Sequence, residues 1–545
     1  MLHSRNLKKN ALLFVLFVSL LPSLFAQPFE KTPRLVVNIL VKDLQTNQVT
    51  AFYDKLGDNG LKKILKDGSY FPNASFDHVA TFEGGNIATL VTGTQPAVHG
   101  LIGGSWYNPI RGNQEWALGA DINNLNDSIS RCKLTTKNIL CSTVSDELLI
   151  INSKQAKVAS IGIDVTEALI TSGHSSQYQF WYNNNNQFTS ILCGKDSLPN
   201  WVKEFNAKKF PEMYATRWWG PLYDLNSYHE YQSPSNISGA NTNRSFLYNL
   251  AQMGANGKLA NYIKGSPYIN TIIRDFAVTL MVSENYGKDG ITDMINITFT
   301  SKPRVRENVS ILDAETEDLV LRLDKDIETL LTFLNDWVGK DRYLLTLTST
   351  GGSAREPIEL EAYNIPTGVF SGKKATSLLS LYLMALYGQN KYIKNYQDGN
   401  FYLDKEVFEK NNINFEDVKS KCATFLMQVS GVGMAITNSE LNSAVYNDGL
   451  KLKIQRSYHP LRSGDILIAL KPGWVEEFEI KGSEMLRFSS NDQRVPLCFY
   501  GWQIKKQEVI KPISLTTFAP TLSLLLKLNP PNGSEASGLS EVIIK

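Results

Sequence analysis

The chain alternates short runs of apolar, often β-branched residues with longer segments of helical periodicity. The apolar runs are Leu35–Val41, Val158–Ile163, Met294–Phe299, Tyr343–Leu347 and Ile466–Leu470. Continuous apolar runs of this length are typical of parallel strands that are buried on both faces of a sheet. Because helices separate them, the pattern predicts an α/β fold, a three-layer sandwich with a mainly parallel central sheet.

The clearest helical pattern extends from Glu315 to Val338. Apolar residues recur there at steps of three and four, which places them on one face of a helix. These residues are Leu319, Leu323, Ile327, Leu330, Leu334 and Val338. The charged Glu317, Lys325 and Glu328 are expected on the solvated face. A second apolar helix is predicted from Leu378 to Tyr387.

Two stretches interrupt the alternation of strands and helices. Residues from about 175 to 260 are rich in Tyr, Trp, Asn and Pro, and residues from about 375 to 455 combine an apolar helix with a lysine-rich stretch. The chain has neither an internal repeat nor a Gly/Ser-rich or Pro-rich linker. We therefore expect residues 27–545 to form one large domain that carries these stretches as insertions.

The N-terminal segment has the three parts of a secretory signal peptide. Basic residues up to Lys9 precede an apolar run from Ala11 to Leu21, and Ala26 precedes the expected cleavage point. The run is shorter than the roughly 20 residues that a spanning helix needs, so residues 1–26 are expected to be removed. The product is expected to be exported to the periplasm, the outer membrane or the cell surface, without a transmembrane span.

The overall charge excludes one class of partner. The 545 residues include 55 Lys or Arg and 53 Asp or Glu, for a formal net charge of +2. Removal of the leader deletes three basic residues and no acidic one, so the balance becomes −1. A nucleic-acid-binding protein needs an excess of basic residues, so no nucleic acid is expected as the main partner.

The chain contains five cysteines, an odd number, so at least one thiol is expected to be free. Cys132 and Cys141 are close enough in sequence for a local disulfide in an oxidising compartment. The others are Cys193, Cys422 and Cys498. Since no pair has C-x-x-C spacing, a cysteine zinc site is not expected.

Long motifs spread over the chain resemble those of a known family. They include "LVVNILVKDL" at 35–44, "VTGTQPAVHG" at 91–100, "SPYINTIIRDFA" at 266–277 and "RSGDILIALKPGW" at 462–474. In order and spacing they resemble secreted bacterial alkaline phosphatases with a threonine nucleophile, within the alkaline phosphatase and phosphodiesterase superfamily. The resemblance implies the same fold. It also implies a phosphoric ester hydrolase in which two zinc ions surround a hydroxyl nucleophile.

The positions onto which the family's metal ligands and nucleophile fall carry other residues. The aspartate ligand of the first strand falls on Lys42, and the threonine nucleophile falls on Glu83. The remaining ligand positions fall on Pro303, Glu307, Thr350, Gly351 and Arg494. Lysine, proline, glycine and arginine do not ligate zinc in such sites. The sequence therefore predicts that this chain holds no zinc, although the family does.

The positions that would contact the substrate are also replaced. The asparagine that touches a phosphoryl oxygen in the family falls on Gly104. A lysine and an arginine of the family fall on Asp164 and Thr166. Asp164 lies near Glu167 in sequence, and two carboxylates there would repel a phosphate dianion.

Several interpretations of the replaced positions remain open. In the first, Lys42 and Arg494 pair with Glu83 and Glu307 and fill the vacated metal cavity with salt bridges. In the second, Glu83, Glu307, Asp43 and Asp164 form a carboxylate site for Mg²⁺ or Ca²⁺.

Two further interpretations remain. In one, Glu83 serves as a nucleophile or general base. In the other, Lys42 and Arg494 bind an anionic ligand without hydrolysing it. Five histidines remain after the leader, none at a ligand position. His99 in "PAVHG" and His174 in "SGH" are expected to be structural.

The sequence thus supports two functional hypotheses. The first is a catalytically inactive alkaline phosphatase-like protein of the cell envelope, a binding or scaffold subunit whose partners are envelope or surface proteins. The alternative is a metal-dependent hydrolase of phosphate or sulfate esters with a rebuilt active site. The first explains why all seven positions change while the glycine turns and the apolar core runs are kept.

Overall fold

The computed structural model describes most of the chain after residue 31. The described residues are 32–79, 82–125, 128–191, 197–229, 246–306, 309–310, 312–352, 357–480, 483–488 and 494–544. The predicted leader, Cys193 and Glu307 lie outside these ranges.

Four of the five predicted strands form the centre of a ten-stranded sheet. They are β1 (Leu35–Asp43), β5 (Val158–Gly162), β8 (Asp293–Thr300) and β9 (Tyr343–Gly352). They are parallel in the order β9-β1-β8-β5. The predicted α/β fold with a mainly parallel sheet is therefore confirmed.

Shorter strands extend both edges of this sheet. On the β9 side, β17 (Val495–Gly501) runs antiparallel to β9 and to β2 (Ser69–Ser75). The short β18 (Gln507–Glu508) and β19 (Ile513–Ser514) pair with β2. On the β5 side, β6 (Tyr178–Tyr182) is parallel to β5, and β7 (Phe188–Thr189) returns antiparallel.

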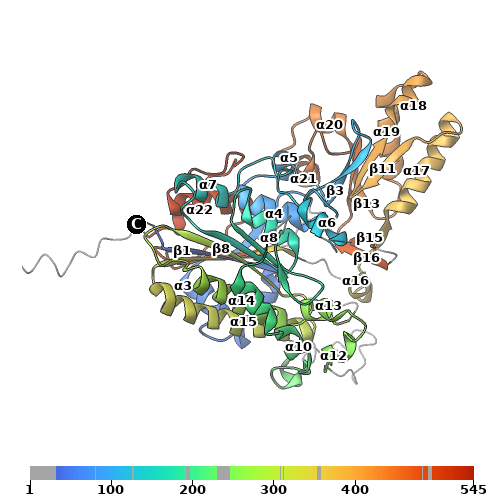
Figure 1. Ribbon diagram of the computed structural model, residues 1–545. Coiled ribbons are helices and arrows are strands. Elements are labelled where there is room, and N and C mark those ends of the chain that lie inside the picture. Colours follow the sequence, from blue (N-terminus) through green and yellow to red (C-terminus); the bar gives the residue numbers. More distant parts are fainter. Residues whose placement is uncertain are drawn as a thin grey trace, which may run out of the picture.

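Helices cover both faces of the sheet, which gives three layers (Figure 1). Odd-numbered residues of β1 such as Val37 and Ile39 pack toward α14 (Tyr268–Ser283) and α15 (Ala314–Leu334). Even-numbered residues such as Val36 and Leu40 belong to the core on the opposite face. Its helices are α4 (Glu83–Thr92), α7 (Val144–Ile151), α8 (Val165–Ser172) and α22 (Phe518–Leu526). Since side chains alternate along a strand, Lys42 belongs to this second face.

Several short helices and strands lie between these elements in the chain. They are α2 (Thr46–Phe52), α3 (Leu61–Asp67), α5 (Pro96–His99), β3 (Ser105–Asn108), β4 (Asn113–Trp116), α6 (Ser128–Cys132) and α16 (Pro357–Ala362).

The predicted helix is α15, which continues into a π-helical turn at Asn335–Gly339. Its apolar face is buried as expected, and Lys325 is exposed. The prediction that Glu317 is solvated is wrong, because its side chain is fully buried. Residues of the first insertion cover this face of the helix, and Glu317 accepts hydrogen bonds from Lys55 and the backbone N–H of His229.

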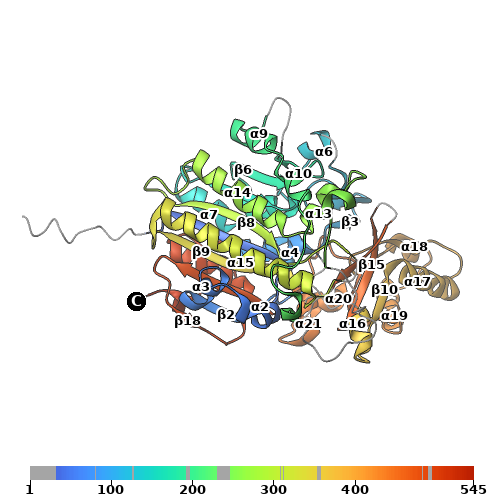
Figure 2. The same ribbon diagram turned by 90° about the horizontal axis from the view of Figure 1, so that it is seen from below.

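The first insertion begins later than the sequence pattern suggests. Residues 178–189 fall inside the predicted boundary, but β6 and β7 belong to the central sheet. Short helices follow and pack beside α14 and α15 (Figure 2). They are α9 (Asn200–Ala207), α10 (Phe210–Ala215), α12 (Leu250–Met253) and α13 (Leu259–Lys264).

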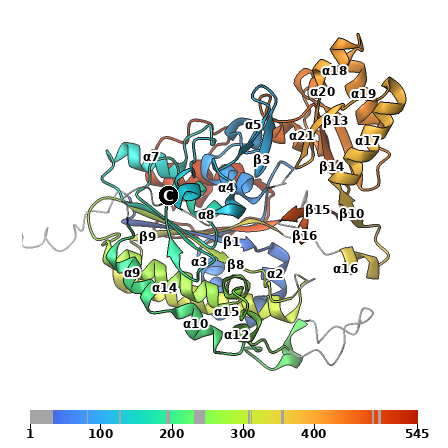
Figure 3. The same ribbon diagram turned by 45° about the vertical axis from the view of Figure 1, so that its right-hand side comes forward.

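The second insertion is larger than predicted and forms a lobe beside the sandwich, which we call the distal lobe, residues 368–488 (Figure 3). Its four-stranded antiparallel sheet is ordered β11 (Ile393–Gln397), β12 (Asn400–Leu403), β14 (Ile466–Leu470) and β13 (Val432–Thr437). A second sheet contains β10 (Gly368–Ser371), β15 (Trp474–Ile480) and β16 (Ser483–Phe488). The lobe's helices are α17 (Gly372–Tyr387), α18 (Lys405–Lys410), α19 (Phe415–Leu426), α20 (Asn438–Ser443) and α21 (Gly449–Ser457).

The assignment of Ile466–Leu470 to the parallel core sheet is therefore wrong. This strand is β14, an interior antiparallel strand of the distal lobe. All five of its residues are buried, because the lobe has small apolar cores of its own. A continuous apolar run indicates burial on both faces, but it does not say in which sheet the strand lies.

Arg462 attaches the distal lobe to the sandwich. Its guanidinium lies 4.4 Å from the centroid of the Trp106 ring. It also donates hydrogen bonds to the carbonyl oxygens of Gly100, at 2.6 Å, and Asn138, at 2.8 Å. A second attachment is made by Asp398, described below.

The cysteines differ from the expected pairing. Cys132 is disulfide-bonded, whereas Cys141 is free, so the predicted local bridge between these two residues is not formed. Cys422 and Cys498 are also free and buried, which agrees with the expectation of an unpaired thiol. In the ranges that the structure describes, none of the helices combines the length and the apolar character needed to cross a membrane.

Candidate functional site

Lys42 lies near the carboxyl end of β1 and is almost completely buried. Its ammonium nitrogen is 3.0 Å from Glu83 Oε2 and 3.3 Å from Asp164 Oδ2, and it also contacts Glu167 Oε1. Carboxyl ends of parallel strands are where α/β folds place their sites. A single buried cation therefore occupies the centre of three carboxylates at this edge of the sheet.

The two helices that cover this face supply the carboxylates. Glu83 is the first residue of α4, and Asp164 immediately precedes α8. The backbone N–H of Asp164 donates to Glu167 Oε2 at 2.9 Å, which fixes the Glu167 side chain in the first turn. The positive end of each helix dipole favours carboxylates at these positions. Because Lys42 lies on the face of β1 that α4 and α8 cover, its side chain is directed toward the N-termini of both helices.

Two more cations complete the charge balance. Lys264 Nζ lies 2.7 Å from Asp164 Oδ1, and Arg304 is close enough to feel the same carboxylates. Desolvation lowers the pKa of Lys42, but Glu167, Glu83 and Asp164 outweigh it and hold the pKa well above the ordinary lysine value. With Asp43, which also acts on Arg304, four carboxylates thus face three cations. We refer to Lys42, Glu83, Asp164, Glu167 and Lys264 as the Lys42 cluster.

The carboxylates of the cluster titrate differently. Desolvation raises the pKa of the fully buried Glu167 to about 7, although Lys42 opposes the shift. Desolvation acts in the same direction on Asp164, but the attraction of Lys264 and Lys42 is larger, so the pKa of Asp164 lies below its ordinary value. Of these two carboxylates, Asp164 stays ionised and Glu167 takes up a proton more readily.

Thr350 and Gly351, at the end of β9, hold α4 against the sheet. Thr350 Oγ1 donates to Glu83 Oε1 at 2.6 Å, and the Thr350 carbonyl accepts a hydrogen bond from Asn86 Nδ2 at 2.9 Å. Gly351 has a φ of +135°, and a Cβ atom there would lie 2.7 Å from Asn86 Nδ2. Only glycine tolerates both conditions. These residues position Glu83.

The other positions that the resemblance assigns to metal ligands are not part of the Lys42 cluster. Pro303 is buried in the loop that follows β8. Arg494 is exposed just before β17, and its guanidinium donates to Asn73 Oδ1 at 3.2 Å. Glu307 lies outside the described residues. Of the two salt bridges expected to fill the cavity, the pair of Lys42 with Glu83 is formed.

The replaced substrate positions have structural partners. The backbone N–H of Gly104 donates to Asp398 Oδ2 of the distal lobe at 3.2 Å. A Cβ atom on the neighbouring Gly103 would lie 2.6 Å from the same oxygen, so the approach of Asp398 requires a glycine there. Thr166 is buried within α8. The distal lobe thus places a carboxylate directly on this loop of the sandwich.

The residues of the Lys42 cluster do not fit a zinc centre. Zinc needs several anionic or imidazole ligands converging on one point, and here an ammonium group lies where Glu83 and Asp164 come together. Across the described ranges, His, Cys, Asp and Glu side chains form no group of three or more that could hold a metal ion. The position of Lys42 also argues against the Mg²⁺ or Ca²⁺ interpretation, because a divalent cation would be repelled by the ammonium.

The interpretation of Lys42 and Arg494 as an anion-binding pair has no geometric support. Lys42 faces three carboxylates that would repel an anion, and Arg494 lies on the surface beside Asn73. Both oxygens of Glu83 are engaged, one by Lys42 and one by Thr350. A nucleophile needs a free lone pair directed at the substrate, so this geometry also disfavours a nucleophilic Glu83.

The histidines occupy structural positions. His99 is fully buried, where its Nδ1 accepts the N–H of Leu101 at 3.2 Å and its Nε2 lies 3.1 Å from Thr89 Oγ1. Desolvation holds the pKa of His99 well below its ordinary value, so the ring is neutral. The imidazole therefore fixes the turn after α5.

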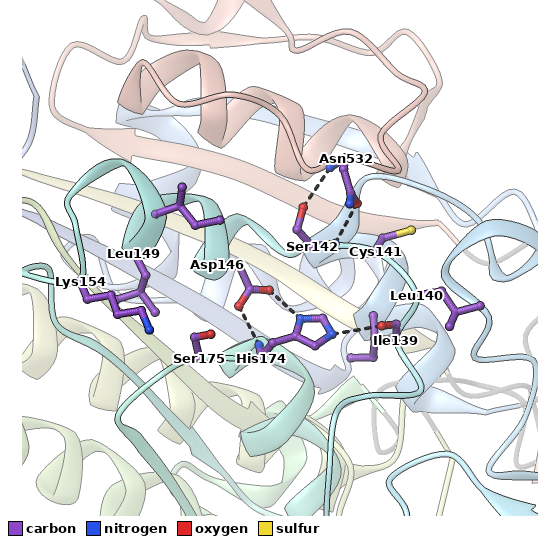
Figure 4. Close-up of a pocket in the computed structure, with 11 residues that line it drawn as sticks. Ile139, Leu140, Cys141, Ser142, Asp146, Leu149, Lys154, His174, Ser175 and Asn532 are labelled. Atoms are coloured by element: carbon purple, nitrogen blue, oxygen red, sulfur yellow. Dashed lines mark hydrogen bonds and ion pairs between the residues drawn. The ribbon is translucent and has the colours of Figure 1, made fainter.

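His174 joins three segments at the edge of a cavity of about 320 Å³ (Figure 4). Its Nδ1 donates to Asp146 Oδ2 at 2.9 Å, and its Nε2 donates to the Ile139 carbonyl at 3.1 Å. Asp146 also accepts the N–H of Thr143 at 2.9 Å. A ring that donates from both nitrogens is protonated. The hydrogen bond with Asp146 raises the pKa of His174, which stabilises this protonated form.

We expect a His174→Gln variant to lose about 1–2 kcal/mol of unfolding free energy at pH 5.5. This is the lower part of the range of roughly 1.5–3 kcal/mol for a hydrogen bond to a charged group, because the His174 side chain is 31% exposed. Because folding raises the pKa of His174, its contribution is complete below the unfolded value of about 6.5 and falls as pH rises through the folded value. The loss should therefore be smaller at pH 8.5. Urea denaturation at the two pH values measures the difference.

The control for this prediction is the Ser175→Ala variant, which changes an exposed neighbour in the same cavity. It should lose little at either pH. An equal loss for His174→Gln at pH 5.5 and pH 8.5 would contradict a charged role for His174.

The sequence match over most of the chain identifies the class of protein. Residues 47–492 match the model of the type I phosphodiesterase / nucleotide pyrophosphatase family, so the chain belongs to that family.

Several characterised relatives cover nearly all of the chain. Alkaline phosphatase PafA of Elizabethkingia meningoseptica is 28% identical over 521 residues, with 94% of each chain covered. Alkaline phosphatase PhoV of Synechococcus elongatus is 27% identical, with 96% of this chain and 95% of the relative covered. The crystal structure of PafA superposes with a TM-score of 0.84 at 27% identity and covers 94% of this chain and 99% of that chain.

Sequence reasoning missed two groups of the site. Lys264 lies far from Asp164 in sequence, in the last turn of a short helix of the first insertion, and no local pattern indicates the contact. Asp398 has a weak signal, because Asp-Gly is a turn dipeptide and Asp398 adopts a positive φ of 49°. The turn could be expected, but not its contact with Gly104.

Proposed function

We propose that this chain is a catalytically inactive member of its family that acts by binding, as a subunit or scaffold in the cell envelope. The observation that carries the proposal is the buried Lys42 ammonium, which pairs with Glu83, Asp164 and Glu167. The resemblance places a metal-ligand aspartate at position 42 and the nucleophile at position 83.

The charge of the Lys42 cluster supports this proposal. A metal centre balances its carboxylates with divalent cations, which also activate the nucleophile and stabilise the leaving oxygen. Here Lys42, Lys264 and Arg304 balance the carboxylates. An ammonium group neutralises the cavity but has no open coordination position for a phosphoryl oxygen. The basic side chains of the protein therefore offset the charge of the carboxylates, as a metal would. They do not activate a nucleophile or stabilise a leaving oxygen, as a metal does.

Export and partner class belong to the same proposal. The predicted leader and the near-neutral charge of the mature chain support a protein of the periplasm, the outer membrane or the cell surface, with envelope or surface proteins as partners. No zinc is needed for this role. A stable complex in native envelope extract, seen as an elution shift of the chain in size-exclusion chromatography, is expected.

The inactive site is tested with the purified mature chain, prepared with zinc in the medium. We expect substoichiometric zinc by elemental analysis and no hydrolysis of aryl phosphate, aryl phosphodiester or aryl sulfate above the buffer rate, with PafA as the active control. Zinc-dependent turnover that disappears in Glu83→Gln would overturn the proposal in favour of a phosphate or sulfate ester hydrolase with a rebuilt site. Turnover that Glu83→Gln retains would identify a contaminating phosphatase.

A further inference from the structure

Helix α17 of the distal lobe has two apolar faces. One face, with Ala375, Leu379 and Leu383, is fully buried in the core of the lobe. The other face is solvent-exposed: Leu378 is 47% exposed and Leu381 is 63% exposed. Soluble helices expose polar residues on the face opposite the core. The exposed leucines of α17 therefore indicate an interaction surface that a binding partner covers.

The neighbouring helix α19 extends the apolar surface. The rings of Tyr382 and Phe425 stack with their centroids 4.4 Å apart, which joins the two helices. Met427, just after α19, is 44% exposed. We call the exposed surface of α17 and the end of α19 the distal face. Figures 1 and 3 show these helices at the outer end of the lobe, away from the sandwich.

Along α17 and the segment that follows it, the charged residues are all lysines. Residues 362–397 contain four lysines and neither Asp nor Glu, and one of the four, Lys394, pairs with Asp404 at 3.3 Å. Two of the lysines, Lys373 and Lys374, lie in the first turn of α17, where the helix dipole disfavours cations. Their charge is thus not favoured by the helix dipole at this end. Lys391 is exposed beyond the opposite end of α17, which brings positive charge to both ends of the leucine stripe.

Helix α19 adds both signs of charge. Lys421 is exposed, and its Nζ lies 3.3 Å from the Tyr387 hydroxyl at the end of α17. The acidic residues are Glu416 and Asp417 in the first turn of α19, and Glu416 pairs with Lys419 at 2.7 Å. The carboxylates thus lie at the opposite end of α19 from Met427, and the apolar stripe keeps its positive rim.

We propose that the distal face binds the surface of an anionic lipid bilayer. An apolar stripe with lysines at its ends is the pattern of a helix that lies in the plane of a membrane interface. Leu378 and Leu381 would enter the boundary between headgroups and acyl chains, and the lysines would contact lipid phosphates. A planar surface can reach these helices without contacting the sandwich, because they lie at the end of a projecting lobe.

Vesicle sedimentation with the full mature chain tests this proposal. The chain is expected to pellet with phosphatidylglycerol-containing vesicles, less so in high salt, and not with pure phosphatidylcholine vesicles. The double variant Leu378→Ser, Leu381→Ser should bind at least about tenfold more weakly, since it removes two apolar anchors. Lys374→Glu and Lys391→Glu should each weaken binding by about fivefold or more.

Matched controls alter exposed residues elsewhere. The double variant Ile110→Ser, Val445→Ser changes side chains that are 89% and 86% exposed. The single variants Lys340→Glu and Lys511→Glu each change an exposed lysine outside the distal lobe by the same charge as each distal-face lysine variant. All of these controls should bind vesicles as the wild type does. Equal thermal melting of all variants confirms that they are folded.

The proposal is overturned if the wild type does not bind anionic vesicles, or if the distal-face and control variants bind equally. It is also overturned if Leu378→Ser, Leu381→Ser leaves vesicle binding unchanged but converts an oligomer of the chain into a monomer in light scattering. That result would identify the distal face as a protein interface. Each outcome is independent of whether the Lys42 cluster is catalytically inactive.

Discussion

Replacement of Lys42 by methionine is expected to lower the free energy of unfolding by about 3–5 kcal/mol, the range for removing one partner of a buried ion pair. The substitution leaves Glu83, Asp164 and Glu167 facing one another without the central cation. Glu167 is fully buried, so water cannot replace the lost ammonium. Methionine matches the length of the lysine stem, so the loss reports on charge rather than on a cavity.

Guanidinium denaturation at pH 8 and at pH 5 measures this effect. The loss should be smaller at pH 5, because Glu167, whose pKa is raised to about 7, then carries a proton and needs no cation. The control is Lys63→Met, which removes a solvent-exposed pair with Asp67 and should cost less than about 1 kcal/mol. If Lys42→Met is no more destabilising than this control, the Lys42 cluster does not act as a structural replacement for a metal.

Replacement of Asp318 by alanine is expected to cost about 3–5 kcal/mol and to loosen the first insertion. Asp318 lies on α15 and is fully buried. It accepts hydrogen bonds from Trp219 Nε1 at 2.7 Å, from the Leu222 N–H at 2.6 Å and from the Tyr228 hydroxyl at 2.8 Å. Alanine would remove the acceptor of the buried Trp219 Nε1–H and Tyr228 hydroxyl, and each such donor costs about 1–3 kcal/mol. The Leu222 N–H would keep the Tyr228 oxygen as an acceptor at 2.9 Å.

Hydrogen exchange is the most direct measurement for Asp318→Ala. Amides in residues 219–228 should exchange faster, while those of β1 and β8 change only with global stability. The matched control is Asp336→Ala, an exposed aspartate in the turn after α15. It should leave both the exchange pattern and the unfolding free energy nearly unchanged. Uniform acceleration across the whole chain would mean that Asp318 stabilises the core and not the insertion.

The central sheet and α15 could be predicted because their signals are local. A run such as Met294–Phe299 is buried on both faces and bounded by polar residues, and α15 repeats its apolar positions over six turns. The same local signal failed for Ile466–Leu470, since an interior strand of a small lobe has the same apolar pattern. It failed for Glu317 because its burial depends on a segment nearly 100 residues earlier in the chain.

The candidate site could be predicted only in part. The resemblance placed Lys42 and Glu83 in one cavity, and opposite charge then made their pairing the simplest arrangement. Glu167 has a local signal, because a glutamate three residues after an aspartate is typical of a helix start. Its contact with Lys42 depends on the packing of α8 over β1. The contribution of Lys264 depends on how an insertion folds back, and residue spacing does not encode that.

The Lys42 cluster also has a consequence for evolutionary reversal. An aspartate at position 42 would bring a further carboxylate against Glu83, Asp164 and Glu167, while Pro303, Thr350, Gly351 and Arg494 would still supply no carboxylate or imidazole ligand. Such a chain would be less stable before it gained any affinity for a metal. If the cluster replaced a metal centre, as proposed above, this single substitution would be disfavoured unless the other ligand positions changed first.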